Sequence, residues 1–274
     1  MSPRTAILAP MVNKLNQWRP LNASDRNALF GLPFRVIKLR PQEYIVREGD
    51  RPRTCGLMLS GFSFRQKQAG NGRRQIFSIH MAGDLADLQN SLLGTADHNL
   101  QALGHVEVAL IPVEAIQEIA FSRPAIGRAM WYETLVDGSI AREWTLNVAR
   151  RDAITRTAHM LCEFALRLET AKLGERLSYA LPMSQEQLAD ALALTPVHTN
   201  RVLMTLGREG AIARNQRAVQ VIDWARLTKI GDFDPAYLHI NGNGPGSRPP
   251  GPSPVRTESS MASAAVIRRP SEGH

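Results

Sequence analysis

The sequence predicts an α+β chain with an N-terminal antiparallel β-roll, a long helix, a C-terminal winged helix-turn-helix and a disordered tail. Three observations predict this class. Short strand-like runs punctuated by glycine fill residues 35–112. A continuous helical pattern of apolar residues covers residues 123–150. Two capped helices with a tight junction, followed by two short strand-like runs, cover residues 184–223.

Length and composition limit the possible classes. With 274 residues, 43% of them hydrophobic, the chain can bury a core of one large or two modest domains. No apolar run approaches the roughly 18 residues of a membrane helix, so no membrane partner is predicted. The stretch "MSPRTAILAPMVNKL" lacks the apolar segment and cleavage site of a secretory signal. Cys55 and Cys162 lie far apart, which predicts two buried thiols in a reducing cytoplasm rather than a disulfide framework or zinc finger.

The net charge of +8 is compatible with a nucleic-acid partner. The basic excess is not concentrated around the two capped helices, however. A DNA-binding hypothesis must therefore rest on the helices themselves.

The first domain is predicted to span residues 1–122. "EYIVREGD" ends in a Gly-Asp turn, "CGLMLSGFSFRQ" alternates apolar and polar residues, and "HVEVALIP" is another strand. Gly70-Asn71-Gly72 is a hairpin signal between two such runs. This pattern is typical of an antiparallel barrel or roll.

The helix predicted for residues 123–150 is apolar on more than one face. One stripe holds Ile126, Met130, Val136, Ile140, Trp144 and Val148, and off it lie Trp131, Tyr132, Leu135 and Leu146. Packing against a second copy of the chain would cover the additional face, although the roll could also cover both faces. We expect charged residues in place of Ile140 and Trp144 to give a monomer.

The domain predicted for residues 151–240 begins with a helix and continues with the capped pair. In "DAITRTAHMLCEFALRLE" an apolar stripe runs through Ile154, Ala158, Leu161, Ala165 and Leu168. Ser184 and Gln187 form a capping box, Ala193-Leu194 make the turn, and Thr195 caps the second helix. That helix ends at Gly210, and its buried face is predicted to hold Val197, Val202, Leu203 and Leu206. "AIARNQ" and "AVQVID" then form a two-stranded wing.

The second helix of such a unit fits the DNA major groove, with its N-terminal residues nearest the bases. Arg201 can contact guanine through two hydrogen bonds, and Asn200 suits adenine. Ser184 and Gln185, at the start of the first helix, are placed to hold a phosphate. The remaining candidates in the first turns of the second helix are Thr195, Pro196, His198 and Thr199. The alternative is a winged helix that serves only as a protein-contact module.

With these elements together, the chain resembles the Crp/Fnr family of bacterial transcription regulators. The resemblance covers about residues 21–238 and is carried by "YIVREGD", "LMLSGFSFR", "GRRQIFSIHMAGDLADLQNSLLG", "SQEQLADALALTPVHTNRVLMTLGREGAI" and "DFDPAYL". It implies a cyclic-nucleotide-binding-like roll, a dimerisation helix and a winged helix-turn-helix. It also implies a cytoplasmic homodimer that binds double-stranded DNA, contacts RNA polymerase, and activates or represses transcription.

The same resemblance bears on the signal. Family members that bind cyclic nucleotides have a Gly-Glu-Leu segment followed by an arginine that pairs with the phosphate. Here Gly83-Asp84-Leu85 stands at the segment, and His98-Asn99 stands at the arginine position. No Lys or Arg lies between Arg74 and Arg123, and a buried phosphate without a cation is costly, so cyclic AMP is not expected to bind. Asp84 and His98 could bind another ligand, or could satisfy each other or the loop backbone.

No cofactor is identified. Other family members hold an iron–sulfur cluster on four cysteines, and two cysteines in one chain cannot do so. A haem on His80, His98, His105 or a methionine stays open, although a single histidine is more often structural.

The sequence lacks the G-x-S-x-G, P-loop, H-E-x-x-H and Cys-x-x-Cys motifs, so an enzyme is not expected. The other alternative is a signalling module that acts through protein contacts.

Residues 241–274 are dense in Pro, Gly and Ser, and we predict a disordered tail because such a segment buries too little apolar surface to offset its ordering entropy. A chain that ends at Ile240 is expected to melt at the same temperature as the full chain and to bind DNA equally well. Thermal melting and a DNA titration test this. A large loss of affinity would show that arginines of the tail, such as Arg248 and Arg256, contact phosphates.

Overall fold

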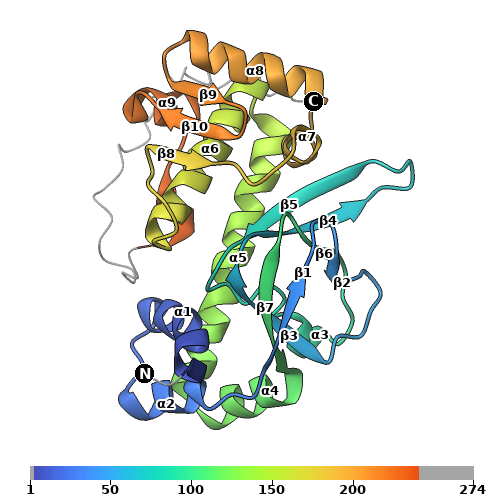
Figure 1. Ribbon diagram of the computed structural model, residues 1–274, viewed down its shortest axis with the longest axis vertical. Helices are drawn as coiled ribbons and strands as arrows, with labels where there is room; N and C mark the ends of the chain where they lie inside the picture. The colour runs from blue at the N-terminus through green and yellow to red at the C-terminus, as the bar shows by residue number, and fades with distance from the viewer. Residues whose placement is uncertain (1–2, 241–274) are drawn as a thin grey trace, which may run out of the picture. The chain divides into compact units, whose positions relative to one another are not determined.

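The computed structural model describes residues 3–240, and the structural statements that follow concern those residues (Figure 1). The prediction for the tail lies outside the described residues. The chain begins with two helices that the sequence analysis did not predict, α1 (Pro3–Trp18) and α2 (Ala23–Phe30). Asn22 caps α2, since its side chain accepts a hydrogen bond from the backbone N–H of Asp25 at 2.8 Å.

Two antiparallel sheets form the predicted roll. The first has the order β1 (Arg35–Leu39), β7 (Val106–Pro112), β3 (Thr54–Ser60). The second has the order β2 (Tyr44–Val46), β6 (Asn99–Ala102), β4 (Ser63–Gln68), β5 (Arg74–His80). Two further helices accompany the sheets, α3 (Asn90–Leu93) and α4 (Val113–Ser122).

Glycines set two turns of the roll. The predicted hairpin at Gly70-Asn71-Gly72 joins β4 to β5, and Gly72 has a φ of +80°. The run "CGLMLSGFSFRQ" is two strands, because the chain turns at Gly61, whose φ is +74°. A Cβ at Gly61 would lie 2.4 Å from the carbonyl oxygen of His105, so the turn requires glycine for space as well as for conformation.

The long helix is α5 (Pro124–Arg150), which Figure 1 draws in green alongside the roll. Five residues of its predicted stripe are buried and Val148 is half-buried, and the residues that cover them belong to this chain itself. Ile140 and Trp144 are 7% and 6% exposed and belong to the core that α5 shares with α6 (Ala153–Thr170). The indole N–H of Trp144 donates to the Glu163 carboxylate at 3.0–3.1 Å. Charged residues at these two positions are therefore expected to disrupt the protomer's own core, so a monomer obtained from this change would not by itself locate a dimer interface.

The large apolar residues of α5 that stay exposed among residues 3–240 are Trp131, Leu135 and Leu146, at 66%, 54% and 43% exposure. At 3.6 residues per turn they fall within an arc of about 60°. We call these three residues the exposed α5 stripe. Other sides of α5 contact α1, β5 and α6.

The C-terminal part of the described chain forms a winged helix-turn-helix on α6. Its elements are β8 (Ser178–Ala180), α7 (Gln185–Leu192), α8 (Pro196–Arg208), β9 (Ile212–Asn215), β10 (Ala218–Val221), α9 (Trp224–Ile230) and the 3-10 turn η1 (Pro235–Leu238). The wing has three strands in the order β8-β10-β9, one more than predicted. The predicted apolar stripe of α6 is buried from Ala158 to Leu168, as is Cys162 beside it. Cys55 is buried in the roll.

Candidate functional site

Local capping fixes the two helices of the helix-turn-helix. The Ser184 hydroxyl accepts from the backbone N–H of Gln187 at 3.2 Å, and the Gln187 side chain accepts from the N–H of Ser184 at 2.8 Å. Ala193 ends α7 in the left-handed region with a φ of 51°. Thr195 caps α8 by accepting from the N–H of His198 at 3.2 Å, and Pro196 occupies the first helical position. These predicted caps set the angle at which the chain enters α8.

The two faces of α8 differ from the prediction at two positions. Thr199, Val202, Leu203 and Leu206 are buried. Thr199 is 0% exposed and its hydroxyl donates to the Thr195 carbonyl at 3.0 Å, so it supports the helix start and cannot reach DNA. Val197, expected in the core, is 67% exposed. The prediction erred because residues 197 and 199 lie on opposite sides of the helix at 100° per residue.

The remaining candidates of the two helices are accessible. Pro196, His198, Asn200 and Arg201 are exposed on α8. Gln185, at the start of α7, donates from Nε2 to Oδ1 of Asn200 at 3.2 Å. The structure thus joins two candidates that the sequence places 15 residues apart. The pair leaves the Asn200 amide N–H groups and the Gln185 amide oxygen free to contact a partner.

A groove of about 780 Å³ borders α7, α8 and the wing. It reaches from Ser184, Gln185 and Asn200 to Arg214 and Arg217 on the wing. These two arginines were not among the residues predicted to contact DNA. Their only sequence signal is the pair of cations around the turn "RNQR". With them the groove combines amide groups with cations, a suitable lining for a polyanion.

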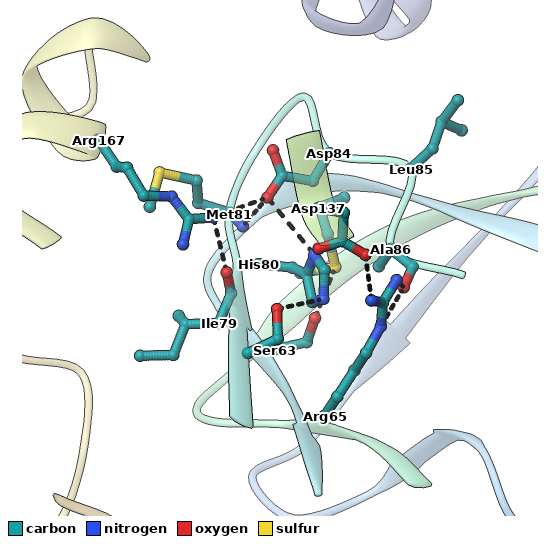
Figure 2. Close-up of polar contacts among 12 residues, drawn as sticks. Ser63, Arg65, Ile79, His80, Met81, Asp84, Leu85, Ala86, Asp137 and Arg167 are labelled. Carbon is teal, nitrogen blue, oxygen red and sulfur yellow. Dashed lines mark hydrogen bonds and ion pairs between the residues drawn. The ribbon is translucent and has the colours of Figure 1, made fainter. Parts of the chain in front are cut away.

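The second candidate site is the loop Gly83-Asp84-Leu85. Asp84 is 6% exposed and accepts from the backbone N–H of Met81 at 3.0 Å and from Nζ of Lys14 at 2.7 Å. Arg167 of α6 lies 3.5 Å from the same carboxylate, and Figure 2 shows Asp84 between Arg167 and His80. Burial alone would raise the pKa of Asp84, but Lys14, His80 and Arg167 hold this pKa well below its usual range. Asp84 is therefore a structural anion that joins three elements.

His98 and Asn99 do not join this loop. His98 pairs through Nδ1 with Asp97 at 2.6 Å and lies edge-on to Phe77. The Asn99 side chain accepts from the backbone N–H of Glu48 at 3.1 Å. Burial, with Arg65 nearby, lowers the pKa of His98. Asp84 and His98 thus do not satisfy each other; Asp84 takes the loop backbone and Lys14 instead.

The cations around Asp84 were not predicted from the sequence. Lys14 bridges Asp84 and Glu133, at 2.7 and 2.8 Å. Arg65 pairs with Asp137 and also donates to the carbonyl of Ala86 (Figure 2). The expectation that no cation would lie near the loop was wrong, because the cations come from α1, β4 and α6 rather than from residues 75–122. Each of them already has a carboxylate partner.

These residues border a cavity of about 550 Å³ between α1, the loop, α5 and α6. Gly83, Asp84 and Leu85 line it, whereas His98 and Asn99 do not. Of the five residues at the nucleotide-binding positions, three therefore line this cavity and two lie elsewhere in the roll.

The histidines proposed as haem ligands have different environments. In His80, Nε2 lies 3.1 Å from the Ser78 hydroxyl and Nδ1 lies 3.6 Å from the Asp84 carboxylate. Burial and Arg65 lower the pKa of His80 to about 4, so the ring is neutral at pH 7. His105 is exposed. Among residues 3–240, no group of three or more His, Cys, Asp or Glu side chains is arranged to hold a metal ion.

Replacing Lys14 with methionine is expected to destabilise the protein by about 2–3 kcal/mol, because it leaves Glu133 buried without its cation and leaves Asp84 with Arg167 alone, at 3.5 Å. The loss should fall below that of a fully buried pair, since the Lys14 side chain keeps 26% exposure. Urea unfolding measures it. The matched control is Lys38→Met, which removes an exposed pair with Glu107, also at 2.8 Å, and should change stability little. Equal unfolding midpoints for the two variants would contradict the expectation.

None of the helices among residues 3–240 has the length and apolar character needed to cross a bilayer.

Comparisons with known proteins match both parts of the chain. Residues 155–230 match the model of the Crp-like helix-turn-helix domain, and residues 36–123 match that of the cyclic nucleotide-binding domain. The chain is 27% identical over 194 residues to the transcriptional activator protein FnrL of Cereibacter sphaeroides, covering 69% of this chain and 77% of that protein. It is 29% identical over 196 residues to the nitrogen fixation regulation protein FixK of Bradyrhizobium diazoefficiens, covering 72% and 81%.

Solved structures confirm the fold. The structure of FixK2 from Bradyrhizobium japonicum superposes with a TM-score of 0.67 at 24% identity, covering 73% of this chain and 98% of that one. The structure of a CooA mutant from Carboxydothermus hydrogenoformans gives a TM-score of 0.57 at 18% identity, covering 72% and 88%. The predicted α+β architecture of roll, long helix and winged helix-turn-helix is thereby confirmed.

Proposed function

Because the chain belongs to the Crp/Fnr family of transcription regulators, we propose that it binds an inverted-repeat DNA site as a homodimer, with α8 in the major groove. The observation that carries this proposal is the division of α8 into two faces. Val202, Leu203 and Leu206 hold the helix in the core. Arg201 and Asn200 are exposed, and Asn200 lines the groove. A rigid helix that presents amide and guanidinium groups is suited to base edges.

Each exposed group takes a role that its chemistry allows. Arg201 donates two hydrogen bonds to a guanine edge, and the free Asn200 amide N–H groups donate to a neighbouring base. Gln185, with Ser184 and the start of α7, holds a phosphate. Thr195, Pro196 and His198 border the contact, and Arg214 and Arg217 add phosphate contacts from the wing. Thr199 acts only by holding the first turn of α8.

The exposed α5 stripe is the surface we propose for dimerisation. Trp131, Leu135 and Leu146 are large apolar side chains on a single face. Burying a fully exposed side chain of this kind contributes roughly 1.5–3 kcal/mol, so each of these partly exposed ones contributes less, and a twofold pairing covers all three in both copies. This arrangement would place two copies of α8 on one DNA duplex.

We further propose that the regulator acts in the cytoplasm, where its DNA partner is, that it works with RNA polymerase, and that it has no enzymatic activity. Its effector is not cyclic AMP. Arg65 and Arg167 lie near the Gly83-Asp84-Leu85 loop. Asp137 already neutralises Arg65, and Asp84 and Glu163 already neutralise Arg167. A phosphate would have to displace these carboxylates from buried pairs, which costs free energy.

Calorimetry with millimolar cyclic AMP is expected to give no binding heat for the full chain. The same titration on Asp84→Asn, in which Arg167 and Lys14 each lose one carboxylate partner, tests whether pairing of these cations with carboxylates is what prevents cyclic AMP from binding. A micromolar dissociation constant for the unmodified chain would contradict the expectation.

The proposed function is tested by selection from a library of random DNA duplexes. The full chain is expected to enrich an inverted repeat whose half-site centres lie about 34–36 Å apart, one turn of DNA. If the chain enriches no sequence and binds all duplexes alike, the proposal fails and the winged helix serves another purpose.

A further inference from the structure

An apolar side chain lies among the polar groups on the proposed DNA-binding face of α8. Val197 is 67% exposed in the first turn of the helix. Its neighbours His198, Asn200 and Arg201 are exposed and polar or charged. Among residues 3–240, no hydrophobic cluster includes Val197. Its exposure therefore has no explanation in the packing of the described chain.

The position of Val197 relative to Arg201 limits what it can meet. The two residues are four apart, so they share one face and lie about 6 Å apart along the helix axis. Successive base pairs rise by about 3.4 Å. If Arg201 contacts a guanine, Val197 lies over a base pair one or two steps away. This step rests on the proposed function.

A valine side chain cannot form a hydrogen bond, so it discriminates only by apolar contact. In the major groove the only apolar group on a base edge is the C5-methyl of thymine. We propose that Val197 reads thymine, with its γ-methyl groups packed against that C5-methyl, one or two base pairs from the guanine read by Arg201. Each half-site would carry one such thymine.

The test uses the DNA site that the full chain selects, with each thymine replaced in turn by deoxyuridine, which removes only the methyl group. Unmodified protein is expected to lose affinity by about fourfold per half-site at one thymine position, the effect of one buried methyl group. Val197→Ala should bind the selected site more weakly and should not distinguish thymine from uracil at that position. Val197→Thr, which keeps one methyl group, should retain part of the discrimination.

The matched control is Val36→Ala, which shortens another exposed valine, 41% exposed on β1 of the roll. It should show the same sensitivity to uracil as the unmodified protein. Three results overturn the inference alone: a selected site in which no thymine methyl affects affinity, equal sensitivity to uracil in Val197→Ala and the unmodified protein, or a Val197→Ala variant with full affinity for the selected site. A chain that selects no site overturns the proposed function, and this inference with it.

Discussion

Replacing Arg201 with alanine is expected to weaken binding to the selected DNA site by about 5- to 150-fold per half-site, while binding to random DNA changes little. The reason is that a bidentate contact between arginine and guanine contributes roughly 1–3 kcal/mol of discrimination. A phosphate contact would instead weaken all sequences alike and reduce the salt dependence. The measurement is a pair of titrations, with selected and random duplexes, at two salt concentrations.

Two control variants sharpen this test. Arg208→Ala removes an exposed arginine from the same helix, seven residues or about 10 Å further along its axis, and should not relax specificity. Gln185→Ala should weaken both duplexes by similar factors, because we assign Gln185 to the phosphate backbone. Equal losses on both duplexes for Arg201→Ala would make Arg201 a backbone contact and would mean that another face of α8 meets the bases.

The double variant Trp131→Glu/Leu135→Glu is expected to be a folded monomer. Both side chains are more than half exposed in the protomer, so charging them does not disturb its core. Four carboxylates facing each other across a twofold interface would strongly disfavour association. Sedimentation measures the mass of the variant. A titration with the selected site should show a lower affinity, because a monomer contacts only one half-site.

Leu173→Glu serves as the control, since Leu173 is 44% exposed just beyond α6 and outside the exposed α5 stripe. It should sediment like the unmodified protein. A dimeric Trp131→Glu/Leu135→Glu variant would move the interface to another surface. Charged residues at Ile140 and Trp144 are instead expected to lower the stability of the protomer itself, because both are buried.

Features encoded over a few residues could be predicted from the sequence. The capping box of Ser184 and Gln187, the Thr195 cap and the left-handed Gly210 depend only on near neighbours, and all three are present. The Gly70-Asn71-Gly72 hairpin is another such case. Periodicity also identified α5 as apolar on more than one face.

Features that depend on distant partners could not be predicted. Lys14 meets Asp84 and Glu133 across separations of 70 and 119 residues, and no local pattern encodes those pairs. Periodicity assigned faces to α5 but could not tell which face α6 would cover. Ile140 and Trp144, chosen from the sequence as interface positions, lie in the core of the protomer. At the start of α8, the phase of the helix decided that Thr199 is buried and Val197 exposed.

A spacing experiment on the selected DNA site tests most directly that two copies of α8 read it together. Five base pairs inserted between the half-sites turn them to opposite sides of the duplex, whereas ten restore their alignment. The five-base-pair insertion is expected to lower affinity by at least about 100-fold, because the base contacts of one half-site are lost at roughly 1–3 kcal/mol each. The ten-base-pair insertion restores the alignment of the half-sites but moves them one further turn apart. It should also bind weakly, since the dimer fixes the separation of its two copies of α8. Equal affinity for the selected site and the five-base-pair insertion would contradict a dimer that reads two half-sites through α8.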